Sequence, residues 1–128
     1  METAIAVLMM VMGVGIAGVW TRDILAGELV DLSEGLFQAR DGDDGSLLWL
    51  HWLAEYTTAA CLTVGGIGLL SDSAWGGPLA GFALGALFYT SVNSLGWALA
   101  RRERRAYSAP MIAGVLVSLL GAVYLITG

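Results

Sequence analysis

One ionisable side chain lies deep inside an apolar stretch of this chain, where a carboxyl group can do chemistry. Glu55 falls about eight residues inside the stretch of residues 47–70. An ionised carboxylate at that depth in a bilayer costs on the order of 2.5–3.5 kcal/mol, so it must be paired, hydrated or protonated. Glu55 therefore either binds a proton or a ligand, or holds helices together through hydrogen bonds.

The polar residues expected nearest to Glu55 define a candidate ligand site. His51 precedes Glu55 by four residues, which places both on one helix face. Asn93, on the next antiparallel stretch, reaches a similar depth, and Tyr89 lies one turn away from it. We predict that His51, Glu55, Tyr89 and Asn93 bind a ligand in a polar cavity that faces the cytoplasm. Simpler roles remain open, with His51 as an interfacial aromatic residue and Asn93 as a hydrogen bond between helices.

The residue types give little support for metal, redox or hydrolytic chemistry. His51 is the only histidine and Cys61 the only cysteine, so the chain supplies neither a zinc ligand set nor a dithiol relay. The sequence also shows no nucleophile paired with a base and no cofactor motif. We therefore expect no catalytic residues, no metal and no cofactor, and an enzyme is the least supported function.

Four apolar stretches must position the candidate residues, and each is long enough to cross a bilayer. They cover about residues 3–21, 47–70, 77–100 and 109–127. Only 13% of the 128 residues are charged, whereas a soluble domain usually has about 25%. We predict an all-α polytopic membrane protein, with a single four-helix transmembrane domain over residues 1–128.

The long first connection has a helical pattern of its own. Leu25, Leu29, Leu32 and Leu36 recur at helical spacing, and the acidic residues lie mostly off that stripe. This pattern favours a short amphipathic surface helix over about residues 23–38, between the first and second membrane helices.

The arginines predict the orientation in the cell membrane. All six basic residues are arginines, and they fall only in the first and third connections. By the positive-inside rule, residues 22–46 and 101–108 are cytoplasmic and both termini are extracytoplasmic. The arginines of the third connection are also candidates for binding lipid phosphate, namely Arg101, Arg102, Arg104 and Arg105.

The stretch from Ala54 to Thr90 resembles the central hairpin of DoxX-like four-helix membrane proteins. The matching text is AEYTTAACLTVGGIGLL, followed after a short turn by PLAGFALGALFYT. In that group an acid-bearing helix continues into a glycine-rich and leucine-rich half, and the next helix ends in aliphatic and aromatic residues. The resemblance implies four membrane helices, and some members of the group are linked to respiratory or sulfur-oxidising complexes.

Two functions fit these features. The first is a protein that binds, or helps to move, a small apolar or amphipathic molecule such as a quinone, an isoprenoid or a lipid. The alternative is a non-catalytic subunit or scaffold of a larger membrane complex, docked through glycine faces such as Gly81-x-x-x-Gly85. Membrane lipids and a homo-oligomer or larger complex are the expected partners. The net charge of −5 gives no support for nucleic-acid binding.

Overall fold

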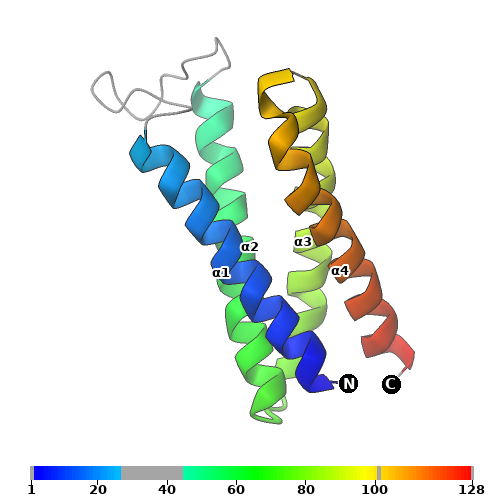
Figure 1. Cartoon of the computed structure of the whole chain (residues 1–128). Helices are drawn as coiled ribbons and strands as arrows, with labels where there is room; N and C mark the ends of the chain where they lie inside the picture. The colour runs from blue at the N-terminus through cyan, green and yellow to red at the C-terminus, as the bar shows by residue number, and fades with distance from the viewer. Residues whose placement is uncertain (1, 27–44, 101, 128) are drawn as a thin grey trace.

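The chain folds into four long helices that lie side by side as a bundle (Figure 1). The computed structural model describes residues 2–26, 45–100 and 102–127. The all-α, four-helix fold predicted from the sequence is confirmed. The elements are α1 (Glu2–Ala26), α2 (Gly45–Leu70), α3 (Gly76–Ala100), the 3-10 helix η1 (Arg102–Tyr107) and α4 (Ser108–Thr127).

Each α-helix is long and apolar enough to cross a bilayer. The candidate spans measure 22 to 25 residues, and about 20 are needed. Large apolar side chains such as Val14, Phe82 and Leu120 point outward and are exposed. An apolar exterior of this extent suits lipid and not water, so the chain is a multi-pass membrane protein.

The first helix is longer than the sequence predicts. The expected surface helix begins at about residue 23, but α1 continues without interruption to Ala26. The charged pair Arg22 and Asp23 does not end the helix, because Asp23 is buried on its inner face and bonded there. The remainder of the predicted surface helix, residues 27–38, lies outside the described residues.

The up-and-down course of the chain gives the bundle two different ends. Both termini and the α2–α3 turn lie at one end, and the end of α1, the start of α2 and η1 lie at the other (Figure 1). We call the second end the arginine end, because Arg22, Arg102, Arg104 and Arg105 all fall there.

The turn between α2 and α3 makes these helices antiparallel neighbours. Asp72 adopts a left-handed conformation with φ of 49°. The N–H of Ser73 donates a 3.0 Å hydrogen bond to the carbonyl oxygen of Gly68, which is the Schellman pattern that ends a helix. The sharp reversal brings Glu55 of α2 opposite the second half of α3.

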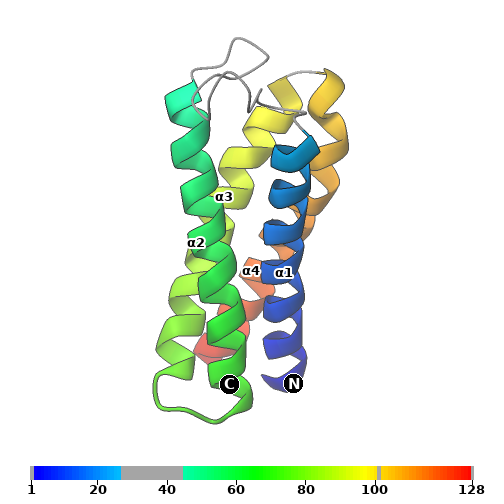
Figure 2. The ribbon, with the colours of Figure 1, turned by 90° about the vertical axis from the view of Figure 1, so that its left-hand side faces the viewer.

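The bundle is closed firmly on three sides and loosely on the fourth. α1 packs on α2, α2 on α3 and α3 on α4, whereas α1 and α4 touch at few positions. Figure 2 shows α3 behind α2, and α4 crossing from behind α1 at the upper right toward the lower left. The α1–α2 contact is so close that a Cβ atom at Gly66 would lie 2.7 Å from the carbonyl oxygen of Ala6. The interior is therefore most accessible between α1 and α4.

Candidate functional site

The carboxyl group of Glu55 is the buried polar centre of the bundle. Glu55 is only 2% exposed, and its Oε1 accepts a 2.8 Å hydrogen bond from Ser94 Oγ of α3. The indole of Trp20, on α1, also hydrogen-bonds this carboxyl. One carboxyl group thus joins α1, α2 and α3, at a depth where polar groups must find partners within the protein.

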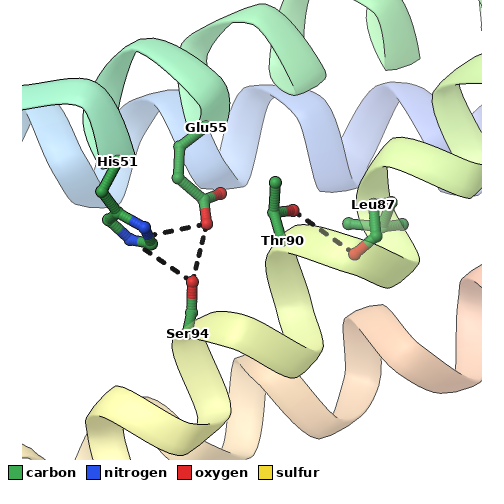
Figure 3. Close-up of polar contacts among 5 residues, drawn as sticks. All are labelled: His51, Glu55, Leu87, Thr90 and Ser94. Atoms are coloured by element: carbon green, nitrogen blue, oxygen red, sulfur yellow. Dashed lines mark hydrogen bonds and ion pairs between the residues drawn. The ribbon is translucent and has the colours of Figure 1, made fainter. Parts of the chain in front are cut away.

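His51 completes a triangle of polar side chains (Figure 3). Its Nε2 lies 3.7 Å from Glu55 Oε1 and 3.4 Å from Ser94 Oγ. The two side chains lie on one face of α2, as their spacing of four residues predicts. The His51 ring also meets the edge of Trp20, with ring centroids 5.3 Å apart, so Trp20 contacts both α2 residues of the site.

The structure does not bring the other two predicted site residues to Glu55. Tyr89 is 70% exposed and Asn93 is also exposed, both on the outward face of α3. The residue that faces the carboxyl is Ser94, which follows Asn93 directly. Successive residues of an α-helix point about 100° apart, so a placement based on depth alone selects the wrong neighbour.

A cavity of about 240 Å³ reaches Glu55 from the side of the bundle where α1 and α4 face each other. Glu55, Ser91 and Trp20 form its buried floor, and each is at most 4% exposed. The walls are apolar and come mainly from α1 and α4. The full lining consists of Val11, Met12, Gly15, Ile16, Val19, Trp20, Glu55, Ser91, Pro110 and Met111.

Aromatic rings fill the space between this cavity and the arginine end. Tyr107 of η1 stacks on Trp20 with ring planes 8° apart and centroids at 6.3 Å. The Trp97 ring lies 6.0 Å from Trp20 and 5.7 Å from Tyr107. The lining of the cavity thus indicates an opening between α1 and α4, and the cytoplasm-facing cavity expected from the sequence stays a prediction.

A second buried carboxyl group, which the sequence does not single out, lies beside these rings. Asp23 is 1% exposed and accepts a 2.7 Å hydrogen bond from the Tyr107 hydroxyl. This bond ties the end of α1 to η1, and thus to the α3–α4 pair. Its position three residues after Trp20 places it on the same helix face, which is the signal available in the sequence.

The described arginines of the third connection differ in how far they are exposed. Arg104 is buried, and its guanidinium lies 4.3 Å from the centroid of the Trp97 ring, a cation–π contact. Arg102 and Arg105 are exposed. Arg101 lies outside the described residues. Binding of lipid phosphate stays a prediction, and of the described arginines in this connection it suits Arg102 and Arg105.

The floor of the cavity can both donate and accept hydrogen bonds. A carboxylate accepts them, a carboxylic acid also donates one, and the Ser91 hydroxyl does either. A molecule with a hydroxyl or carbonyl group can therefore bond to the floor while the apolar walls hold its remaining atoms. Among residues 2–26, 45–100 and 102–127, no group of three His, Cys, Asp or Glu side chains is placed to hold a metal ion.

Comparison with known proteins identifies a family. A family model described as a domain of unknown function (DUF8058) matches residues 1–127. This match gives no assignment to the DoxX-like group that residues 54–90 resemble. Among curated proteins and solved structures, no match is found.

Replacing Ser94 should destabilise the bundle, whereas replacing its neighbour Asn93 should not. Ser94→Ala removes a donor from the buried Glu55 carboxyl, and the expected loss in the free energy of unfolding is about 1–2 kcal/mol. Asn93→Ala changes an outward side chain, and the expected change is within about 0.5 kcal/mol. Unfolding by dodecyl sulfate in mixed micelles measures both. Equal losses for the two variants would contradict the hydrogen bond assigned to Ser94.

Proposed function

This chain belongs to the DUF8058 family, and we propose that it binds a small apolar or amphipathic molecule within the membrane. The molecule is of the kind represented by a quinone, an isoprenoid or a lipid. Its polar group bonds to Glu55 at the floor of the cavity between α1 and α4. The observation that carries the proposal is that an apolar cavity ends at a buried carboxyl, which the bundle holds in place from three helices.

The direction of the opening supports a ligand that comes from the bilayer. The rim of the cavity includes Val11 and Val19, which are exposed on the lipid-facing surface of α1. Trp20, the Tyr107 ring stacked on it and the tilted Trp97 ring lie on the route from the arginine end. An apolar molecule dissolved in the membrane meets the opening directly, whereas a water-soluble molecule would have to cross hydrocarbon first.

The size of the cavity limits which part of the ligand enters. A volume of about 240 Å³ corresponds to roughly eight water molecules at about 30 Å³ each. It is smaller than the sites that enclose a whole drug-sized molecule, which are about 300–1,000 Å³. A single ring or a short polar head group fits, and an attached hydrocarbon tail extends through the opening into the lipid.

The polar atoms of the floor favour an uncharged head group with oxygen atoms. As a carboxylate, Glu55 accepts a hydrogen bond from a hydroxyl group, and as an acid it donates one to a carbonyl oxygen. Ser94 donates a hydrogen bond to this carboxyl, and His51 bonds to Ser94 and lies 3.7 Å from the carboxyl oxygen. These contacts orient the carboxyl group toward the cavity. A quinone and its quinol present these two kinds of oxygen atom.

A second function, a non-catalytic subunit of a larger membrane complex, is favoured by the outward face of α3. Tyr89 and Asn93 present polar groups on that face, and a polar group in hydrocarbon needs a partner. Nothing lies within 4 Å of where a Cβ atom would be at Gly81 or Gly85, so this motif is free to pack on another helix. Purification in a mild detergent separates the two functions, since a complex yields stoichiometric partner proteins.

We also propose that the arginine end faces the cytoplasm and that both termini are extracytoplasmic. In a variant with Cys61→Ala, a new cysteine at Ser73 in the α2–α3 turn should react with a membrane-impermeant thiol reagent in intact cells. A new cysteine at the exposed position Arg105 should react only after the cells are opened. The reverse labelling pattern would overturn the orientation.

Filling the cavity should abolish ligand binding without disturbing the bundle. Gly15 lines the cavity and has nothing within 4 Å of its Cβ position, so Gly15→Leu can begin a side chain there and place it against the cavity. Native mass spectrometry of protein purified in a mild detergent should show a small co-purified molecule on the wild type and none on Gly15→Leu. Glu55→Gln should lower its occupancy by about tenfold, as expected for a hydrogen bond to a charged group.

The matched control is Gly81→Leu, because Gly81 also has open space around it but lies on the outward face of α3. This variant should retain the molecule at wild-type occupancy. If Gly15→Leu retains the co-purified molecule as well, the cavity is not its binding site and the proposed function is wrong.

A further inference from the structure

We infer that the groove between α1 and α2 binds an anionic phospholipid, with one acyl chain along the groove and the phosphate group at Arg22. This groove is open along its outer side and has a volume of about 840 Å³. It is separate from the cavity that ends at Glu55. Small residues of both helices form its floor, including Ala17 and Gly18 of α1 and Ala60 of α2.

The length of the groove matches one leaflet of a bilayer. Its α1 residues run from Gly13 to Leu25, which is roughly 18 Å at the helical rise of 1.5 Å per residue. Half of the hydrocarbon core is about 15 Å. Gly13 lies near the middle of α1 (Glu2–Ala26), so the groove extends from about the membrane centre to the arginine end.

The groove closes where the two helices come into direct contact. A Cβ atom at Gly13 would lie 2.6 Å from both the carbonyl oxygen of Ala59 and the Oγ1 of Thr63. Toward the arginine end the helices diverge, and a Cβ atom at Gly18 would meet nothing within 4 Å. The open part is therefore the half that lies within a single leaflet, and an acyl chain has that shape and polarity.

The polar side chains of the groove lie toward the end where a lipid head group would lie, except for Thr63, whose hydroxyl bonds to the carbonyl oxygen of Ala59. Thr21 Oγ1 and the Tyr56 hydroxyl share a 2.7 Å hydrogen bond across α1 and α2. Arg22, the next residue of α1, lines the same end. A guanidinium has five N–H donors, so it can bind phosphate oxygens alongside any other partner. This positive charge above an apolar channel favours an anionic lipid over a zwitterionic one.

A second copy of this chain fits the groove less well than a lipid does. Two copies inserted in the same orientation and related by a twofold axis through this face would bring their Arg22 side chains to the same end of one interface. Like charges that face each other across a contact oppose association. A lipid phosphate instead supplies the opposite charge at that position.

The inference does not depend on the proposed function, because α1 presents different glycines to the two sites. Gly15 lines the cavity between α1 and α4, and Gly18 lines the groove between α1 and α2. Both have open space at the Cβ position. A leucine at one position fills one site and leaves the other unchanged.

Lipid titration with native mass spectrometry tests the groove. Phosphatidylglycerol or phosphatidylcholine is added to the intact protein in a neutral detergent, and bound lipid is measured against concentration. The wild type should bind phosphatidylglycerol about fivefold more tightly, the effect of one arginine near an anionic head group. Arg22→Gln should remove this preference. Gly18→Leu should reduce the occupancy of both lipids, and Ala60→Leu on the facing helix should do the same.

The control is Gly81→Leu on α3, which lies outside the groove and has open space at its Cβ position. This variant should bind the two lipids as the wild type does, and circular dichroism and elution volume should show that every variant is folded. A retained preference in Arg22→Gln, or unchanged occupancy in folded Gly18→Leu and Ala60→Leu, would overturn the inference. Displacement of phosphatidylglycerol by sodium phosphate alone would also overturn it, because the ligand would then be free phosphate.

Discussion

A polar group left without a hydrogen-bond partner in hydrocarbon costs several kcal/mol, and this constraint decides how the helices of the bundle are rotated about their axes. The carboxyl group of Glu55 lies inside the membrane-spanning part of α2, and its partners come from three helices. Ser94 bonds to it from α3 and Trp20 from α1, while His51 approaches from the preceding turn of α2. Rotating any of these helices by one residue would turn a partner away from the carboxyl group. The same contacts that satisfy the carboxyl therefore keep the floor of the cavity in place.

The cavity beside Glu55 exists because α4 packs against α3 and makes few contacts with α1. At the arginine end, α1 is instead tied to η1 by the hydrogen bond from Tyr107 to Asp23 and by the stacking of Tyr107 on Trp20. These polar and aromatic contacts join α1 to η1 at that end, and the cavity lies on the α1–α4 side. The other side of α1 carries a separate apolar groove, so one helix faces both proposed ligands. In both proposals, α1 is the helix that contacts molecules of the bilayer.

Much of the fold could be predicted from the sequence, because the bilayer imposes a length and a polarity on each helix. The charged residues Arg22 and Asp23 led us to predict that the first membrane helix ends at about residue 21. In the structure α1 continues to Ala26, because Asp23 accepts a buried hydrogen bond. Of the candidate site, the sequence could predict the pair on α2 but not its partner on α3. The spacing of His51 and Glu55 places them on one face within one helix, but the partner on α3 depends on the rotation of a second helix. Depth along the membrane therefore favoured Asn93, whereas the structure places Ser94 against the carboxyl. The sideways opening could not be predicted either, because it depends on rings from three separate elements that meet at Trp20.

The central claim is that Glu55 lies at the floor of a cavity open to lipid and closed to water. Labelling with carbodiimides tests it most directly, since these reagents react with carboxyl groups and exist in lipid-soluble and water-soluble forms. In membranes that contain the protein, we expect dicyclohexylcarbodiimide to modify Glu55, as detected by mass spectrometry of the peptide. We expect Gly15→Leu to suppress this modification and a water-soluble carbodiimide to leave Glu55 unmodified. Failure of the lipid-soluble reagent to reach Glu55, or equal modification by the two reagents, would show that the cavity does not open to lipid.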